Sequence, residues 1–241
     1  METKVFADAE SVACESARLI AEEARSAVAA HGRFVMAVSG GKTPWIMLRN
    51  LAREDVPWNA VHVIQVDERI APPGDPDRNL THLRESLLSH TRLDAEQIHA
   101  MPVESVDLDA ACACYAQTLE RIAGSPPVLD LVHLGLGPDG HTASLVPGDP
   151  VLRVMDANVA LTGIYQGRRR MTLTYPVINR ARKVLWLVTG GEKAGMLVRL
   201  QAGDPSIPAG HIRTDDSVLL ADRAVADRVE IPAIPRNYRK I

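Results

Sequence analysis

The sequence predicts an α/β fold: a single domain over residues 1–241, built on a mostly parallel sheet with helices on both faces. Short apolar runs typical of buried strands alternate with helical patterns along the whole chain. No long linker, repeat or low-complexity segment divides them. The composition, 46% hydrophobic and 24% charged over 241 residues, is ordinary for a globular domain.

Composition and charge argue against several classes of function. The net charge of −3 does not indicate a nucleic-acid-binding surface, and no apolar run approaches the ~18 residues that a membrane span needs. Residues 1–10 lack the basic and apolar regions of a signal peptide. Cys14, Cys112 and Cys114 have no histidine or cysteine cluster to complete a zinc site, so we expect buried free thiols. We therefore expect a cytoplasmic protein without a metal.

The first elements of the chain lead to a candidate anion site. Asp8 can cap a helix whose apolar residues recur at helical spacing and which ends near Gly32. A strand over 34–38 follows and runs into a loop of small residues, after which Pro44 favours the start of a second helix. Free backbone N–H groups and the positive end of a helix meet in such a loop.

The chemistry of this loop suits a phosphate monoester on a sugar or another small metabolite. It is not a nucleotide-binding Walker A loop, which would need glycine at Met36. The candidate phosphate-binding residues in the loop are Ser39, Gly40, Gly41 and Thr43. A plain turn between strand and helix remains the alternative for this stretch taken alone.

A second polar segment follows the next expected strand, over 61–66. The strand ends in Asp67-Glu68-Arg69, and a proline-rich loop leads from there to a helix that begins near Asn79 and ends near Ser89. Because the carboxyl ends of parallel strands meet at one edge of a sheet, we expect this segment to lie near the phosphate loop. A solvated rim is the alternative, which we consider slightly less favoured.

The third segment carries the candidate base. A helix over 109–123 and a strand over 129–134 lead into a stretch rich in glycine from Gly135 to Gly148. His141 lies in it, two residues after Asp139. An imidazole with a pKa near its ordinary ~6.5 can take a proton from water at neutral pH.

This glycine-rich stretch has two other interpretations. The pattern Gly135-x-Gly137-x-x-Gly140 formally matches a dinucleotide fingerprint. Asp139 would place a carboxylate beside the pyrophosphate, and the pattern comes past the middle of the chain, so this interpretation is disfavoured. A glycine-rich turn in which His141 only bonds the backbone stays open on the local sequence.

The last third of the chain supplies cations. The pattern over 151–167 is weak, and three arginines then precede a strand over 171–174, with Arg168 and Arg170 on one face and Arg169 on the other. We expect one of that pair to reach a phosphate. A short helix over 177–181 and a strand over 184–188 follow.

A second loop from glycines to a helix comes after that strand. It runs from Thr189 to Lys193, and Lys193 near the helix start can serve an anionic ligand. A lysine on the helix surface is the alternative. A last strand is expected over 218–221, and the segment from Pro232 onward is expected to be irregular.

With these positions in place, the chain resembles the 6-phosphogluconolactonases, the lactone hydrolases of the oxidative pentose phosphate pathway. The resemblance spans nearly the whole chain in order. It rests on Ser39-Gly40-Gly41-x-Thr43-Pro44, Asp67-Glu68-Arg69 with Arg78-Asn79, Gly135-x-Gly137-Pro138-Asp139-Gly140-His141-Thr142-Ala143-Ser144-Leu145, Arg170-x-Thr172, Ile178-Asn179 and Gly190-Gly191-Glu192-Lys193-Ala194. It implies the α/β fold shared by glucosamine-6-phosphate deaminases and ribose-5-phosphate isomerases.

The resemblance also implies a substrate and roles. The substrate would be 6-phospho-D-glucono-1,5-lactone, held through its phosphate by the Ser39–Thr43 loop with Lys193 and Arg170. His141 would be the general base, oriented by Asp139. Arg69, with Lys193 as second candidate, would stabilise the oxyanion. Asp67 belongs to the catalytic set, either touching substrate or positioning Arg69. No metal or cofactor is implied, and we expect a monomer.

Two alternatives are carried forward. Glucosamine-6-phosphate deaminases share several of these motifs, but they place a glutamate before the proline where this chain has Val146, and a tyrosine where it has Arg69. A non-catalytic sugar-phosphate sensor would carry a DNA-binding domain of about 50 residues or more. The strand expected from Phe34 leaves no room for one ahead of it.

Overall fold

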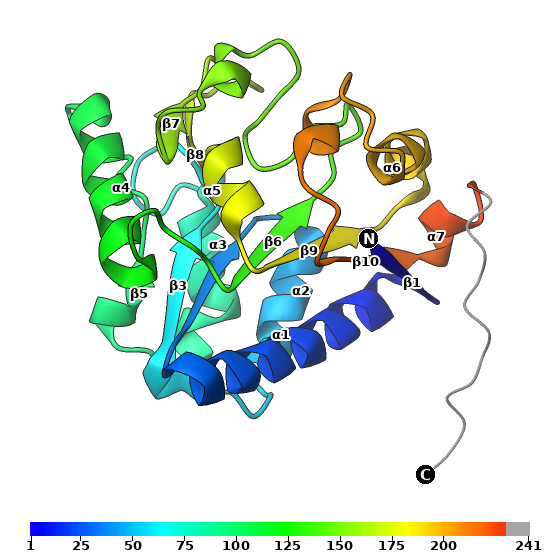
Figure 1. Ribbon diagram of the computed structural model, residues 1–241, viewed down its shortest axis with the longest axis horizontal. Coiled ribbons are helices and arrows are strands. Elements are labelled where there is room, and N and C mark those ends of the chain that lie inside the picture. Colours follow the sequence, from blue (N-terminus) through cyan, green and yellow to red (C-terminus); the bar gives the residue numbers. More distant parts are fainter. Residues whose placement is uncertain (230–241) are drawn as a thin grey trace.

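The computed structural model describes residues 1–229; the segment expected to be irregular, from Pro232, lies outside the described residues. The main sheet has seven strands, all parallel to their neighbours (Figure 1). In spatial order they are β1 (Glu2–Phe6), β10 (Ser217–Asp222), β9 (Lys183–Val188), β6 (Leu131–Gly135), β2 (Phe34–Val38), β3 (Val61–Gln65) and β5 (Ile98–His99). The predicted parallel sheet is confirmed.

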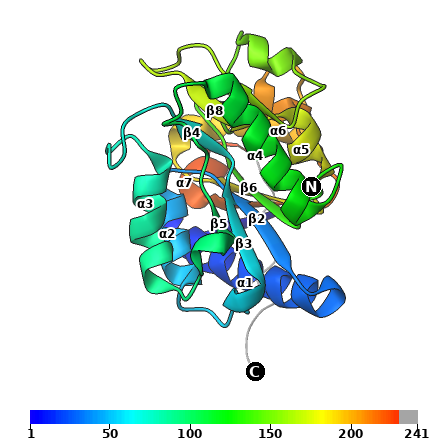
Figure 2. The same ribbon diagram turned by 90° about the vertical axis from the view of Figure 1, so that its left-hand side faces the viewer.

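Helices cover both faces of this sheet, as Figure 2 shows for α2 and α3 on one face and α4 and α5 on the other. The helices are α1 (Ala9–His31), α2 (Lys42–Leu51), α3 (Asn79–Ser86), α4 (Leu108–Ala123), α5 (Tyr175–Arg180), α6 (Ala194–Gln201) and α7 (Arg223–Ala226). Alternate strand residues enter two separate cores, because successive side chains of a strand point to opposite faces. In β2, Phe34 and Met36 pack with α1 and α2, whereas Val35 and Ala37 join the core under α4 to α6.

A second, smaller sheet was not predicted. It is antiparallel and consists of β4 (Asp67–Arg69), β8 (Arg170–Leu173) and β7 (Val159–Leu161). The expected polar segment after β3 is therefore itself a strand, because Val66 carries the chain from the main sheet to a pairing with β8. A strand of three charged residues has no apolar pattern, so only its pairing with a distant segment reveals it.

The strand order places a binding edge at the centre of the main sheet. From β2 the chain builds outward through β3 and β5, and it then returns to the other side of β2 with β6, β9 and β10. The direction in which successive strands are added to the sheet therefore reverses between β2 and β6. In open α/β sheets, the crevice outside the carboxyl ends of the strands at such a switch point is where ligands bind.

Two sequence expectations need correction. The first strand is β1, ahead of the one expected from Phe34; it is an edge strand that pairs only with β10 and is not fully buried, so it lacks a clear apolar pattern. Of the three cysteines, Cys112 is buried, while Cys14 and Cys114 are exposed. Cys114 lies two residues after Cys112 on α4, so the two side chains point in different directions. Within residues 1–229, no helix has the length and apolar character to cross a bilayer.

Candidate active site

The candidate site is a cavity of about 540 Å³ at the switch point of the main sheet. Its walls come from the loops after β2, β6 and β9, together with the small antiparallel sheet. Nine residues that the sequence singled out line it: Ser39, Gly40, Gly41, Thr43, Asp67, Arg69, His141, Arg170 and Lys193. The tenth, Asp139, lies behind His141, outside the cavity lining.

His141 and Asp139 form a bonded pair in the turn after β6. The imidazole Nδ1 lies 2.5 Å from Asp139 Oδ1, which also accepts from the backbone N–H of His141 at 3.2 Å. The carboxylate accepts only, so Nδ1 holds the proton and Nε2 keeps its lone pair. The His141 side chain, 21% exposed, lines the cavity with this geometry. The pair therefore has the arrangement that a general base requires.

Glycines make this turn possible. A Cβ on Gly137 would lie 2.1 Å from His141 Nδ1, so only glycine lets the imidazole lie against the backbone there. Gly140 has φ +83°, a left-handed conformation that glycine adopts freely. No helix follows the turn, which removes the N-terminus that a dinucleotide fingerprint needs. His141 bonds a carboxylate, so the alternative in which it bonds only the backbone is also wrong.

Asp67 and Arg69 face the cavity from alternate positions of β4. The Arg69 guanidinium donates to Asn79 Oδ1, and Asn79 Nδ2 donates to the Asp67 carbonyl at 2.9 Å. The Asp67 carboxylate accepts from Ser144 Oγ at 2.5 Å. Asn79 thus joins Arg69 to the backbone of Asp67, and its Nδ2 lies 3.5 Å from the Asp67 carboxylate. A Cβ on Gly40 would lie 2.1 Å from Asn79 Oδ1, so the phosphate loop fits closely over this arrangement.

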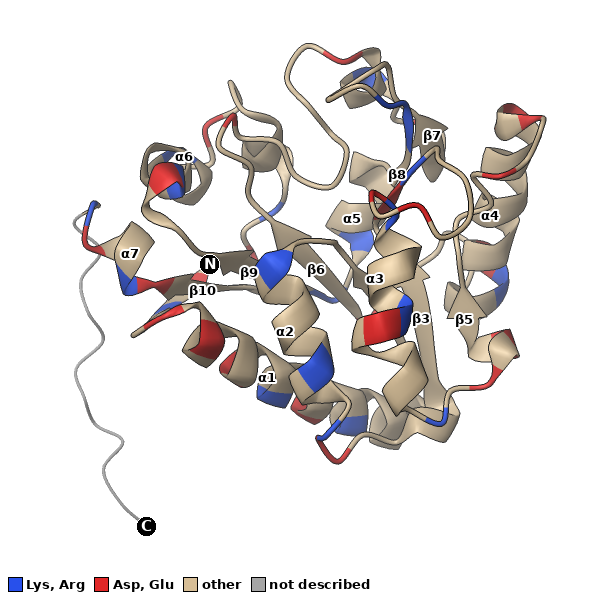
Figure 3. Ribbon diagram, turned by 180° about the vertical axis from the view of Figure 1, so that it is seen from behind, with Lys and Arg blue, Asp and Glu red and all other residues tan. Residues whose placement is uncertain are grey.

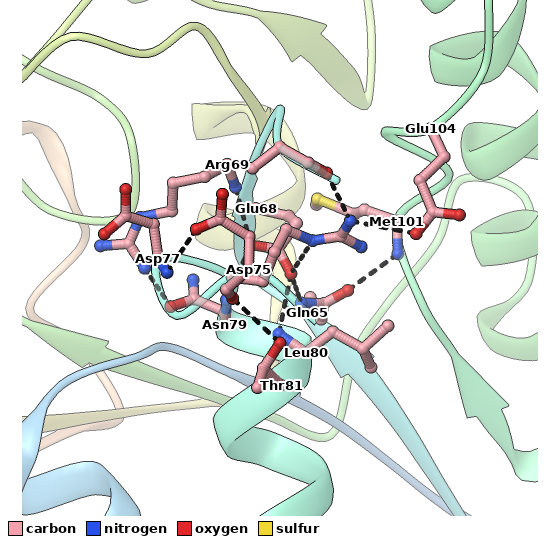
Figure 4. A network of polar contacts seen from close by, with 12 residues as sticks. Gln65, Glu68, Arg69, Asp75, Asp77, Asn79, Leu80, Thr81, Met101 and Glu104 are labelled. Carbon is pink, nitrogen blue, oxygen red and sulfur yellow. Dashed lines mark hydrogen bonds and ion pairs between the residues drawn. The ribbon is translucent and has the colours of Figure 1, made fainter. Parts of the chain in front are cut away.

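Glu68, between them, is not among the residues that line the cavity, as the alternation of side chains along a strand requires. Its carboxylate lies instead at the start of α3 (Figure 4). Its side chain is fully buried. The carboxylate accepts from the backbone N–H groups of Asn79 and Leu80, both at 2.8 Å, and from Gln65 Nε2, also at 2.8 Å. Arg78 Nε lies 3.2 Å away as its ion-pair partner. The sequence grouped Glu68 with the functional residues; the structure corrects this, because Glu68 instead caps α3.

The loop that the sequence predicts to bind phosphate lies between β2 and α2. Gly41, with φ +135°, precedes α2 and offers no side-chain cap, so the first-turn N–H groups of α2 remain for a ligand. Ser39 N–H donates to Nδ1 of buried His133 at 3.2 Å. Burial lowers the pKa of His133 to about 3, which keeps it a neutral acceptor. Thr43 Oγ1 lies 2.8 Å from Thr189 Oγ1 and ties this loop to the one after β9.

Two of the predicted cations, Lys193 and Arg170, reach the cavity. Lys193 is the N-cap residue directly before α6, and desolvation lowers the pKa of its amine, against the opposing effect of Glu192 and Asp222. The pKa of buried Arg170 is lowered mainly by desolvation and, to a smaller extent, by the positive charge of Arg69. Both groups are therefore partly stripped of water beside the cavity, where an anionic ligand would compensate the cost.

Arg168 has a different environment, although it shares an expected face with Arg170. It forms ion pairs with Asp77 at 2.9 Å and Asp75 at 3.0 Å, so the basic segment that leads into β8 lies beside the acidic loop before α3 (Figure 3). It lines a neighbouring hollow of about 420 Å³ and not the main cavity. Of the predicted pair, it is Arg170 that faces the site.

Sequence reasoning missed several residues at the site. Asn79 was recognised only as part of the Arg78-Asn79 motif. Thr189 carried a usable signal, since it directly follows β9 as Ser39 follows β2. Ser144 likewise stands inside a motif of the resemblance without a role of its own, and Tyr165 gave no signal of function. Tyr165 lies in the segment of weak pattern, yet its hydroxyl donates to Asp139 Oδ2 at 3.0 Å.

The charges lining the cavity favour an anionic ligand. They comprise the cations Lys42, Arg69, Arg170 and Lys193 and the carboxylates Asp67, Glu192 and Asp222. Among residues 1–229, no three His, Cys, Asp or Glu side chains come together as a metal site. An α/β sheet with a histidine–carboxylate pair, an uncapped helix N-terminus and desolvated cations around a cavity at its switch point has the features of an enzyme site for a small anionic metabolite.

Comparisons with known proteins agree with this class. Residues 7–220 match the family described as glucosamine-6-phosphate isomerases/6-phosphogluconolactonase. A curated 6-phosphogluconolactonase of Nostoc sp. is 34% identical over 236 residues, covering 95% of this chain and 98% of that protein. The chain belongs to the glucosamine-6-phosphate isomerase/6-phosphogluconolactonase family.

Solved structures show the same fold. The crystal structure of 6-phosphogluconolactonase from Thermotoga maritima aligns with a TM-score of 0.80 at 26% identity, covering 92% of this chain and 98% of that one. A monomeric glucosamine-6-phosphate deaminase aligns with a TM-score of 0.82 at 19% identity, covering 95% of this chain and 100% of that one. Because both enzymes share the fold, the fold alone does not decide between their reactions.

Proposed function

We propose that the protein is a 6-phosphogluconolactonase, which hydrolyses 6-phospho-D-glucono-1,5-lactone to 6-phospho-D-gluconate in the oxidative pentose phosphate pathway. The observation that carries this proposal is the His141–Asp139 pair, with a 2.5 Å contact, at the wall of a cavity lined by cations. The names of the curated relatives support the same activity.

The reaction follows from general base catalysis. His141 Nε2 takes a proton from a water molecule as its oxygen attacks the lactone carbonyl carbon. Arg69, fixed by Asn79, stabilises the oxyanion of the tetrahedral intermediate. The bond from the carbonyl carbon to the ring oxygen then breaks, and the imidazolium returns its proton to that oxygen. A lactone is an activated electrophile, so these steps call for no metal or cofactor.

The phosphate is bound at the other side of the cavity. The first-turn N–H groups of α2 and the side chains of the Ser39–Thr43 loop bind its oxygens, and Lys193 and Arg170 supply positive charge. This binding anchors the ring against His141 and contributes to affinity before the chemical step. Asp67 is a positioning residue in this scheme, since its carboxylate lies 3.5 Å from the Asn79 amide whose oxygen accepts from Arg69.

A glucosamine-6-phosphate deaminase is the second candidate, and position 146 disfavours it. The resemblance to deaminases implies a ring-opening glutamate there. The side chain is Val146, which is buried and lies outside the cavity lining. A valine transfers no protons. At the position of the deaminase tyrosine, Arg69 instead brings a cation to the cavity, which suits an oxyanion.

One pair of assays tests the proposal. Hydrolysis of freshly generated 6-phosphogluconolactone, corrected for spontaneous opening, is measured beside ammonia release from glucosamine 6-phosphate. We expect fast hydrolysis and no ammonia. Ammonia without hydrolysis would support the deaminase and refute the lactonase. If both assays were silent while a sugar phosphate still bound, a non-catalytic sensor would replace both enzymes.

We further propose that residues 1–241 form one domain and that the protein acts as a monomer. Every group in the proposed steps comes from one chain, so a second subunit is not required for the chemistry. Light scattering during size-exclusion chromatography tests this; a dimer at working concentrations would contradict it. A cytoplasmic location and the absence of a nucleic-acid partner stay predictions from the sequence.

A further inference from the structure

Tyr165 lies at the tip of the segment that joins β7 to β8. Gln166 and Gly167 follow it, with φ of +51° and +79°. Tyr165 N–H donates to the Arg168 carbonyl at 2.9 Å, and Arg168 N–H donates back at 3.3 Å. Two left-handed residues closed by this pair of bonds form a tight hairpin turn. Gln166 is not a glycine, so its left-handed backbone conformation costs free energy. The turn that it forms fixes the position of Tyr165.

The tip brings the Tyr165 side chain onto the histidine–carboxylate pair. Its hydroxyl lies 3.0 Å from Asp139 Oδ2 and 3.4 Å from His141 Nδ1. The phenol ring meets the imidazole edge to face, with centroids 5.4 Å apart and an interplanar angle of 65°. On the ring face, the Arg170 guanidinium carbon lies 5.0 Å from the centroid. Gln166 Oε1 accepts from Arg170 at 3.1 Å, so the tip and the guanidinium hold each other.

The direction of the tyrosine hydrogen bond follows from the charge states. Burial raises the pKa of Asp139, but bonds from His141 and, to a smaller extent, Tyr165 oppose this, and the net pKa lies below the ordinary value. Desolvation, then the bond to Asp139, raises the pKa of Tyr165. The carboxylate is therefore ionised and the phenol protonated, so the hydroxyl donates. Asp139 Oδ1 therefore accepts from His141, and Asp139 Oδ2 accepts from Tyr165.

We propose that Tyr165 is a positioning residue of the catalytic pair: by holding Asp139 Oδ2, it keeps Oδ1 aligned with the Nδ1–H of His141. Asp139 is 36% exposed at its side chain, so without this donor the carboxylate would turn toward water and the imidazole would lose its fixed orientation. Tyr165 is not among the residues that line the cavity, so its hydroxyl acts on the substrate through the pair that it contacts. The inference rests on the proposed lactonase activity.

The kinetic test uses Tyr165→Phe, which keeps the ring and its contacts with Arg170 but removes the hydroxyl. We expect kcat to fall about tenfold, the effect of losing one hydrogen bond to a charged group, with KM changed less than twofold. Tyr175→Phe is the matched control, since its buried hydroxyl bonds the Pro208 carbonyl at 3.0 Å away from the site. We expect its kcat to equal that of the wild type.

A double-mutant cycle tests whether Tyr165 acts through Asp139. In the Asp139→Asn background, adding Tyr165→Phe should lower kcat no further than about twofold, because the partner it positions is already impaired. A full tenfold loss in that background would overturn the proposal, since it would mean that Tyr165 acts directly on substrate. Wild-type kcat in Tyr165→Phe alone would overturn it as well.

A third readout needs no turnover and separates this inference from the proposed function. In proton NMR, the Nδ1–H of His141, bonded to Asp139, gives a downfield signal that His141→Asn identifies by its loss. We expect Tyr165→Phe to shift or broaden this signal and Tyr175→Phe to leave it unchanged. If the wild type fails to hydrolyse the lactone but the signal responds, only the proposed function falls. A signal unaffected by Tyr165→Phe would overturn the positioning role.

Discussion

The two faces of β4 carry similar residues and have opposite properties. On one face, Glu68 is fully buried, and its carboxylate accepts from backbone and side-chain donors and pairs with Arg78. On the other, Asp67 and Arg69 line a cavity whose nearby cations, Arg170 and Lys193, are desolvated. Removing a buried charge whose partners are all supplied by the fold destabilises the fold, because those partners are left unpaired. Desolvated charges gathered around an open cavity leave bonding capacity for a ligand.

Removing His141 should have the largest effect on catalysis of all the substitutions around the cavity. We expect His141→Ala to lower kcat by about 10²- to 10⁴-fold, since it removes the general base. The dissociation constant of 6-phosphogluconate, measured by calorimetry, should change less than about threefold, because phosphate binding depends on other groups. His90→Ala, an exposed histidine on another surface, is the control. Near-wild-type kcat in His141→Ala would exclude His141 as the base.

Glu68 should show the reverse behaviour. Glu68→Gln leaves Arg78, itself 2% exposed, without its buried partner, and we expect the free energy of unfolding to fall by about 3–5 kcal/mol. Glu104 contacts the same guanidinium but is 50% exposed, so Glu104→Gln should cost less than about 1 kcal/mol. Urea unfolding measures both.

The kinetics of the folded Glu68→Gln protein complete this comparison. Its kcat should fall far less than that of His141→Ala, because Glu68 lies outside the cavity lining. If Glu68→Gln kept full stability and lost activity as His141→Ala does, the division between the two faces of β4 would be wrong.

The sequence predicted those site residues that directly follow a strand. It did not predict the residues whose positions depend on pairing between distant segments. Ser39, His141 and Lys193 each come after an apolar run, so their meeting at one edge follows from a parallel sheet. The inward turn of Glu68 depends instead on β4 pairing with β8, about a hundred residues later. The choice of Arg170 over Arg168, and the contact of Tyr165 with Asp139, depend on the same small sheet. No local pattern records such pairings.

Lys193 tests whether the desolvated cations serve binding. We expect Lys193→Ala to raise KM about tenfold or more with kcat nearly unchanged, as expected for the loss of a charge-assisted contact to phosphate. A fall in kcat at constant KM would instead assign Lys193 to the oxyanion. Desolvation lowers the pKa of this amine. The amine loses its charge as the pH rises through that lowered pKa, so 6-phosphogluconate should bind more weakly there, and Lys193→Arg should delay the loss to higher pH.

Substituting Arg168 should have the smallest effect on the kinetics, and the result therefore tests where the binding site ends. Its guanidinium is already paired with Asp75 and Asp77 and is 32% exposed at its side chain. A partly exposed pair of this kind contributes little, and we expect Arg168→Ala to change kcat and KM less than about twofold. A rise in KM comparable to that of Lys193→Ala would show that a paired charge still serves the substrate. The neighbouring hollow of about 420 Å³ would then belong to the binding site, and pairing within the fold would no longer distinguish structural from functional charges.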